Sequence, residues 1–226
     1  MRFDIVTILP EAFDGYLNTS ILARAQARDL VDINIFNPRD YVHDPHRSVD
    51  DRPYGGGAGM VLMAEPILRT VQDIKRESKK IKKKKIVLFS AKGRQFNQKL
   101  ALEWSRKYGQ IILISGRYEG IDERVSRILK AEEISIGPYV LTDGDVPAMA
   151  VISSVSRLIP GVIRSESLAE ESHESGLEYP HYTRPEVLKW GGKKYRVPKV
   201  LLSGHHKQIE EWRREQASKT TNKRKI

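Results

Sequence analysis

Three short polar segments of this sequence each follow a stretch of apolar residues, and they are the places where the chain could hold a ligand. They read SAKGR at residues 90–94, SGRYEG at 115–120 and GPYVLTDGD at 137–145. In an open parallel sheet, ligands bind beyond the carboxyl ends of the strands, where these segments would lie. One glycine after a strand is usually only a turn residue, but three such segments with polar or aromatic neighbours predict a site for a flat, neutral or cationic ligand.

The common nucleotide-binding loops are absent from the sequence. No GxGxxG follows an apolar stretch, and GxxxxGK[ST] does not occur, so neither a Rossmann cradle nor a P-loop is expected. The glycine-rich run from Gly55 to Gly59 belongs to an irregular stretch, residues 39–60, instead of following a strand. Loops of that length inside a compact domain are usually functional or disordered.

The elements that would position these segments alternate between strands and helices. Short apolar or alternating runs predict strands, and longer amphipathic runs predict helices. Such alternation predicts an α/β domain with a mostly parallel sheet and helices on both faces. The expected strands span residues 3–9, 31–37, 86–90, 110–115 and 133–136. The expected helices span residues 20–30, 66–79, 97–107, 122–130 and 146–158.

Beyond residue 163 the composition becomes polar and predicts a second, smaller unit. Four Glu and four Ser lie between residues 164 and 176, which is typical of a linker. We therefore expect domains at 1–163 and 178–226, joined by a flexible linker at 164–177. The second domain should end in a helix from His205 to about Ser218.

Composition limits the chemistry that the 226 residues can perform. The sequence has no cysteine, which excludes disulfides, thiolate nucleophiles and cysteine-based metal sites. No apolar run approaches the roughly 18 residues that a membrane span needs, and Asp4 interrupts any signal-peptide core. We expect a cytoplasmic protein that relies on carboxylates, Arg, His, Tyr and backbone amides.

The net charge of +10 is concentrated in two segments. Residues 75–85 contain eight basic side chains and one acid, and residues 213–226 contain six and one, so the rest of the chain is slightly acidic. A local basic surface suits a polyanionic partner, because each phosphate contact releases condensed counterions. The alternative for the lysine run is a solvated surface turn, and for the second segment a disordered tail.

Six blocks of residues give a more specific indication of function. They are VDDRPYGGGAGMV at 49–61, SGRYEGIDER at 115–124, ISIGPYVLTDGDVPAM at 134–149, SVSRLIPGV at 154–162, YPHYTRPEV at 179–187 and VLLSGHH at 200–206. In this order they resemble the bacterial tRNA (guanine-N1)-methyltransferases of the TrmD type, which belong to the SPOUT class. The resemblance runs nearly end to end.

This resemblance implies features that the residue patterns alone do not predict. The fold would be α/β with a trefoil knot near the C-terminal end of the N-terminal domain, plus a small helical C-terminal domain that binds tRNA. The activity would be transfer of a methyl group from S-adenosylmethionine to N1 of guanine 37 in tRNA, next to the anticodon. The protein would be a homodimer with its active site at the dimer interface.

By resemblance, the three polar segments and their neighbours bind the cofactor. The expected residues are Phe89, Ser90, Gly93, Gly116, Tyr118, Glu119, Gly120, Ile136, Gly137, Pro138, Tyr139, Val140, Leu141, Gly144 and Pro147. An apolar slot at residues 136–141 suits adenine, and a sulfonium tolerates a carboxylate such as Glu119. For Ile136, Leu141 and Pro147 the alternative is plain packing. The sequence identifies no metal ligands and leaves open whether Mg²⁺ assists.

The acceptor guanine makes separate chemical demands. Its N1 carries a proton, so methylation needs a general base, and charge that develops on O6 needs a cationic donor. By resemblance the base is Glu171, with Glu170 left open, and the cation is Arg157. Without the resemblance, the Glu pair would be solvated charge and Arg157 would pair with an acid or the helix dipole. The expected tRNA contacts are His181, Tyr182, Arg184 and His205, with loop capping as the plain alternative.

The sequence departs from the family at several positions. Asp143 stands where the family has glycine, Ala91-Lys92 where it has Pro-Gln, and the linker is slightly short. Asp143 is the best argument for a different function, that of a catalytically idle RNA-binding protein of the same fold. A knotted methyltransferase for another nucleotide is a further alternative, against which the blocks at 179–187 and 200–206 argue.

Overall fold

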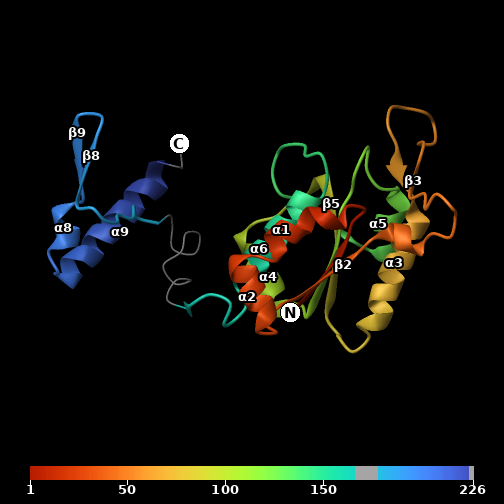
Figure 1. Cartoon of the computed structure of the whole chain (residues 1–226), viewed down its shortest axis with the longest axis horizontal. Coiled ribbons are helices and arrows are strands. Elements are labelled where there is room, and N and C mark those ends of the chain that lie inside the picture. The colour runs from red at the N-terminus through yellow and green to blue at the C-terminus, as the bar shows by residue number, and fades with distance from the viewer. Residues whose placement is uncertain (166–177, 224–226) are drawn as a thin grey trace. The chain divides into compact units, whose positions relative to one another are not determined.

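The protein contains two compact units, Met1–Arg164 and Ser165–Ile226, each described here by itself (Figure 1). The computed structural model describes residues 1–165 and 178–223. The first unit is an α/β domain, and the second contains a β-hairpin and helices. Among the described residues, no helix is both long and apolar enough to cross a membrane.

A five-stranded sheet forms the centre of the first unit, with strand order β2-β1-β6-β5-β7. All neighbouring strands are parallel, as the alternation of strands and helices predicts. Their bounds are β1 (Arg2–Val6), β2 (Asp32–Phe36), β5 (Lys84–Gln95), β6 (Gln110–Ile114) and β7 (Glu132–Ser135). A separate antiparallel pair joins β3 (Asp50–Asp51) to β4 (Val61–Leu62).

Helices cover both faces of this sheet, as predicted (Figure 1). On one face lie α1 (Asp14–Leu17), α2 (Ser20–Ala27), α4 (Gln98–Lys107) and α6 (Asp145–Ser156). On the other face lie α3 (Ala64–Glu77) and α5 (Glu123–Leu129). Two short 3-10 helices, η1 (Pro10–Phe13) and η2 (Pro38–Tyr41), each begin at a proline, whose fixed φ suits a first helical turn.

The alternation of side chains along the central strands divides the core in two. Phe3 and Ile5 of β1 pack into the cluster under α1, α2, α4 and α6, whereas Val6 packs into the cluster under α3 and α5. In β6, Ile111 and Ile112 also point to opposite faces. Because successive side chains of a strand point to opposite faces, a strand buried on both sides is mostly apolar, as β6 is after Gln110.

The largest difference from the sequence prediction concerns β5. The expected strand ended at residue 90, but β5 continues to Gln95 and includes the segment 90–94 that the sequence indicated as a loop. Phe89 and Arg94 both pair with Ile134 of β7, so the residues between them bulge out of the ladder. The polar composition of residues 90–94 hid a strand interrupted by a bulge.

The second unit contains more than the helices that were expected. A hairpin joins β8 (Val187–Trp190) to β9 (Lys193–Arg196) through Gly191 and Gly192, which both have positive φ. Two glycines of this kind permit a tight two-residue hairpin turn. The described helices of this unit are α8 (Lys199–Leu202) and α9 (His206–Lys223), and α9 begins one residue after the predicted start of the final helix and ends beyond its predicted end.

Candidate active site

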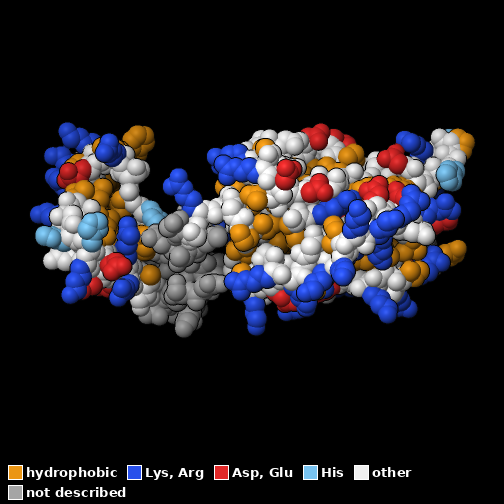
Figure 2. Space-filling model, turned by 90° about the horizontal axis from the view of Figure 1, so that it is seen from below, with side chains coloured by type: hydrophobic (Ala, Val, Ile, Leu, Met, Phe, Trp, Pro, Cys, Tyr) orange, Lys and Arg blue, Asp and Glu red, His pale blue; other side chains and the backbone are white. Residues whose placement is uncertain are grey.

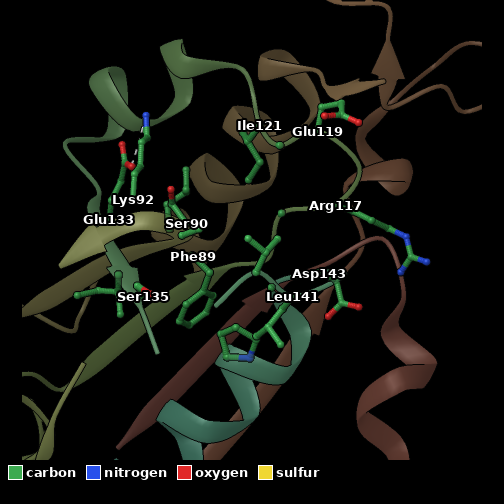
Figure 3. Close-up of a pocket in the computed structure, with 18 of the residues that line it drawn as sticks. Phe89, Ser90, Lys92, Arg117, Glu119, Ile121, Glu133, Ser135, Leu141 and Asp143 are labelled. Atoms are coloured by element: carbon green, nitrogen blue, oxygen red, sulfur yellow. Dashed lines mark ion pairs between the residues drawn. The ribbon is translucent and has the colours of Figure 1, made fainter. Parts of the chain in front are cut away.

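A cavity of about 440 Å³ lies at the carboxyl edge of the sheet, beyond β5, β6 and β7. Its wall is formed by the three polar segments that the sequence indicated and by the first turns of α5 and α6 (Figure 3). Small-molecule sites typically measure roughly 300–1,000 Å³, and ligands of open parallel sheets bind at this edge. The position and size of the cavity therefore suit a small cofactor.

The bulge of β5 forms one end of the wall. It places Ser90 and Lys92 at the cavity. Gly93 does not line the cavity and instead lets β5 approach β7 closely, because a Cβ at this position would lie 2.5 Å from the backbone nitrogen of Ile134. Gly93 therefore shapes the wall through the backbone, and a side chain there would push the two strands apart.

Lys92 brings a charged group to this end of the cavity. Its Nζ lies 3.1 Å from a carboxylate oxygen of Glu123 and 3.6 Å from one of Glu133 (Figure 3). The hydrogen bond to Glu123 and the charge of Glu133 raise the pKa of Lys92, so the ammonium stays charged at neutral pH. The sequence indicated Lys92 only as a departure from the family pattern, and its partners could not be read from spacing.

The loop after β6 carries Tyr118 and Glu119 into the wall. Tyr118 has a φ of 59° and Gly120 a φ of 131°, which turn the chain sharply. The amide of Glu119 donates a hydrogen bond to the carbonyl of Met60, and a Cβ at Gly59 would lie 2.6 Å from Oε1 of Glu119. The end of the glycine-rich run, Gly59 with the following Met60, therefore packs against this loop and supports Glu119.

The loop after β7 supplies the apolar part of the wall. Tyr139, Val140 and Leu141 are exposed, with Val140 at 86% exposure. A side chain at Gly137 would overlap the ring of Tyr139, so Gly137 lets the ring fold over the backbone. Exposed apolar side chains beside a cavity form a surface suited to a flat ring such as adenine.

Asp143 has a structural role in this loop. Its carboxylate accepts hydrogen bonds from the hydroxyl of Thr142 at 2.9 Å and from the amide of Asp145 at 3.0 Å. The residue also forms a backbone bridge with Arg117, which lines the cavity (Figure 3). A negative carboxylate interacts favourably with the positive end of the helix dipole at a helix N-terminus. Asp143 therefore stabilises the start of α6. The loop therefore accommodates a carboxylate at position 143 through these hydrogen bonds.

A buried carboxylate lies beneath the cavity and was not predicted. Asp145, the first residue of α6, is only 4% exposed and accepts a hydrogen bond of 2.8 Å from the hydroxyl of Thr7. Burial raises the pKa of Asp145, and hydrogen bonds from Ser115 and Thr7 oppose that rise. Thr7 follows β1 and Ser115 follows β6, so this carboxylate joins the ends of two central strands to α6.

Most of the expected cofactor residues surround this one cavity. Gly93, Gly137 and Pro138 do not line it. The residues that do are Phe89, Ser90, Gly116, Tyr118, Glu119, Gly120, Ile136, Tyr139, Val140, Leu141, Gly144 and Pro147. Gly144 permits a close approach of two loops, since its amide donates to the carbonyl of Gly116 at 2.8 Å and a Cβ would lie 2.8 Å from Cα of Ser115.

The two expected catalytic residues do not line this cavity in the structure. Arg157 follows the last residue of α6 and lines a different cavity of about 260 Å³ with Tyr16, Ser20 and Ser153. Ten residues of helix separate Arg157 from Pro147, which corresponds to about 15 Å. Glu171, like Glu170, lies outside the described residues.

The expected tRNA contacts lie in the second unit. His181 lies 3.6 Å from a carboxylate oxygen of Glu178, and the ring of Tyr182 lies 6.4 Å from that of Trp212 in α9. The last two expected contacts are Arg184, which precedes β8, and His205, which precedes α9. The described residues contain no cluster of three His, Cys, Asp or Glu side chains that could hold a metal ion.

Known proteins resemble this chain over its whole length. A family described as "tRNA (Guanine-1)-methyltransferase TrmD" matches residues 1–226. The chain belongs to this family. A tRNA (guanine-N(1)-)-methyltransferase of Dictyoglomus turgidum is 51% identical, covering 98% of this chain and 86% of the relative. Those of Dehalococcoides mccartyi strain CBDB1 and Clostridioides difficile are 49% and 46% identical, covering all of this chain and 89% and 96% of the relatives.

Family membership gives the cavity a chemical context. The TrmD blocks at 115–124 and 134–149 form two of the three wall segments, and the block at 49–61 supports Glu119 from behind. The two wall blocks meet at one place because they follow β6 and β7, which both pair in parallel with β5. Arg117 and Glu123 also line the cavity but were not among the predicted site residues. Both lie within the block at 115–124, which is the feature of the sequence that could have indicated them.

Proposed function

We propose that this TrmD family member transfers a methyl group from S-adenosylmethionine to N1 of guanine 37 in tRNA, next to the anticodon. The observation that carries the proposal is the cavity at the carboxyl edge, since two of its three wall segments belong to the blocks that resemble the family. Because tRNA is found in the cytoplasm, we also place the protein there.

The residues around the cavity fit S-adenosylmethionine. Tyr139 and Leu141 offer an apolar surface for adenine, and the close backbone approach at Gly144 leaves amides and carbonyls near it. Glu119 brings a carboxylate that would favour a cationic sulfonium. When bound, the cofactor would supply an electrophilic methyl group. The protein's own task is then to orient the guanine, exclude water and manage the proton on N1.

Proton transfer from guanine is assigned to the linker. We propose that the carboxylate of Glu171 accepts the N1 proton, which makes N1 a nucleophile, and that Arg157 stabilises negative charge on O6. Both assignments come from the resemblance of the sequence. Within the described cavity wall, Glu123 and Glu133 already pair with Lys92, and we assign Glu119 to the cofactor.

The position of Arg157 supports a site shared between two chains. Arg157 lies about 15 Å along α6 from the cofactor cavity of its own chain. If Arg157 acts on the acceptor guanine, it does so most simply at the cavity of a second copy. We therefore propose a homodimer with a composite site, and the trefoil knot implied by the resemblance remains part of this proposal.

An idle RNA-binding protein of the same fold is the competing function, and cofactor binding separates the two. Titration calorimetry should detect binding of S-adenosylmethionine to the full chain. Replacement Leu141→Trp should fill the cavity and weaken this binding at least about tenfold, which corresponds to about 1.4 kcal/mol. Ile128→Trp places the same side chain at an exposed position of α5 outside the cavity wall and should leave affinity unchanged. Absence of binding to the unmodified chain would favour the idle protein.

A further inference from the structure

Four exposed lysines lie at the edge of the sheet opposite the cavity. Lys79, Lys80, Lys82 and Lys83 form the connection between α3 and β5, which we call the lysine turn. The cavity lies beyond the carboxyl ends of the strands, whereas the lysine turn precedes the start of β5 (Figure 1). From Lys84 to Phe89 the strand rises about 16 Å, so the two surfaces are well separated.

The backbone of the lysine turn is anchored to the domain. The side chain of Ile81 packs against Gly109, since a Cβ added to Gly109 would lie 3.0 Å from it. The amide of Ile81 donates a hydrogen bond of 2.9 Å to the carbonyl of Ser78. Ser78 is buried, and its hydroxyl accepts a hydrogen bond of 2.8 Å from Nζ of Lys84. The four lysines therefore project from an ordered turn, which favours a surface with a fixed shape over loose solvated charge.

The acidic side chains near the lysine turn already have partners. Glu77 pairs with Arg2 at 3.3 Å, and Asp73 pairs with Arg76. Further along the run, Lys85 pairs with Glu132. No ion pair joins any lysine of the turn to an acid within residues 1–165 and 178–223. Their four positive charges remain uncompensated there.

Lys and Arg side chains gather on the face that carries this turn. Figure 2 views the molecule from below Figure 1 and shows blue side chains under α3 and the connection that follows it. Such a surface attracts phosphates, because each contact releases a condensed counterion. A membrane surface is less suitable, since interfacial binding also needs apolar side chains that insert, and Ile81 packs against the domain instead.

We propose that the lysine turn binds backbone phosphates of the tRNA body, outside the anticodon stem-loop. The inference rests on the proposed function, which places the acceptor guanine at the cavity. RNA that reaches the opposite edge of the sheet must then extend well beyond that guanine. The lysine turn adds affinity for whole tRNA without taking part in methyl transfer.

The test compares two RNAs and two variants of the full chain. The quadruple variant Lys79→Gln, Lys80→Gln, Lys82→Gln, Lys83→Gln removes the charges, and the matched variant with Arg at the same positions keeps them. With full-length tRNA, the Gln variant should flatten the slope of log affinity against log salt by about 3 units, and the Arg variant should match the unmodified chain. With an isolated anticodon stem-loop that contains the target guanine, all three proteins should bind alike.

The outcomes separate this proposal from the proposed function. Calorimetric binding of S-adenosylmethionine and methylation of the stem-loop report the proposed function alone, and neither should change in the Gln variant. An unchanged salt slope with full-length tRNA would overturn the proposal and leave a solvated turn. An equal loss on the stem-loop would also overturn it, because the contact would then lie in the anticodon arm. Loss of binding only to anionic phospholipid vesicles would assign the surface to membranes.

Discussion

Single residues fix how closely the walls of the cavity approach. Gly93 and Gly144 both stand where an added Cβ would meet backbone atoms at less than 3 Å, whereas Gly116 has ordinary space, with the nearest atom at 3.5 Å. In the sequence, all three glycines lie in polar segments that follow apolar stretches, so the sequence alone does not distinguish their roles. The difference between a packing glycine and a turn glycine depends on which strand lies next to it, which no local pattern encodes.

Gly93→Ala should destabilise the protein. The new methyl group would overlap backbone atoms of Glu133 and Ile134, which cannot move without parting β5 from β7, so we expect a loss of about 1–3 kcal/mol in the free energy of unfolding. Urea unfolding followed by circular dichroism measures it. The matched change Gly15→Ala in α1 meets no atom within 4 Å and should be neutral or stabilising. Equal stability of the two variants would contradict the close approach.

Glu171→Gln should abolish most of the turnover. The amide keeps the shape of the side chain but cannot accept the N1 proton, so kcat should fall roughly 10²–10⁴-fold with little change in cofactor affinity. Single-turnover methylation of tRNA measures this effect. Glu170→Gln is the matched control and should remain within a few-fold of the unmodified chain. If Glu170→Gln is the damaging change, the base is its neighbour and the assignment is off by one residue.

Elements meet beneath the cavity through one buried carboxylate. Asp145, at the start of α6, accepts a hydrogen bond from the hydroxyl of Thr7, which follows β1. It also forms a hydrogen bond with the side chain of Ser115, which follows β6. Burial raises its pKa, so the folded state binds a proton more tightly there than the unfolded state does. Because of this difference in pKa, Asp145 makes folding less favourable as pH rises above the pKa that its carboxyl group has in the unfolded chain.

Asp145→Asn should therefore show a pH-dependent stability difference. The free energy of unfolding of the variant, minus that of the unmodified chain, should become more positive as pH rises above about 4, because only the unmodified chain must bury a charge. Asp122→Asn supplies the opposite sign, since the hydrogen bond from Arg124 lowers the pKa of Asp122, and the stabilisation from this carboxylate is lost as pH falls below about 4. Urea unfolding from about pH 2 to about pH 7 measures both. Parallel trends for the two variants would contradict the assignment.

The sequence predicted the elements better than their ends. Apolar runs such as residues 111–114 are unambiguous, and the parallel sheet and the helices on both faces are confirmed. Local patterns could not predict the bulge in β5, because it depends on pairing with β7. The hairpin of the second unit was also missed, although Gly191-Gly192 between alternating residues is a recognisable turn signal. The ion pairs of Lys92 join elements far apart in the chain, so spacing could not reveal them.

On the scale of the whole molecule, three surfaces of the first unit lie apart from one another. They are the cavity at the carboxyl edge of the sheet, the cavity beside Arg157 and the lysine turn. A single chain would leave Arg157 far from the cofactor, which is the physical reason to propose a dimer. The tRNA-facing surface would then include parts of both chains.

Mixed dimers test the shared site. Arg157→Ala and Leu141→Trp should each be nearly inactive as homodimers when the cofactor concentration is well below the Kd of the Leu141→Trp variant, because the first lacks the cation and the second binds the cofactor weakly. In a heterodimer, one of the two cavities would combine an unblocked pocket with an intact Arg157, so up to about half of the activity per dimer should return. Methyl transfer after subunit exchange, verified by tagged purification, measures this. Activity that stays at the level of the inactive homodimers would contradict a composite site.

The central claim is that the chain methylates guanine N1 at position 37, and identification of the product tests it most directly. The full chain is incubated with labelled S-adenosylmethionine and tRNA transcripts that carry either guanine or adenine at position 37, and the digested nucleosides are separated. We predict one N1-methylguanosine per tRNA with guanine and none with adenine. Methyl label on another nucleotide, or equal labelling of both transcripts, would contradict the account.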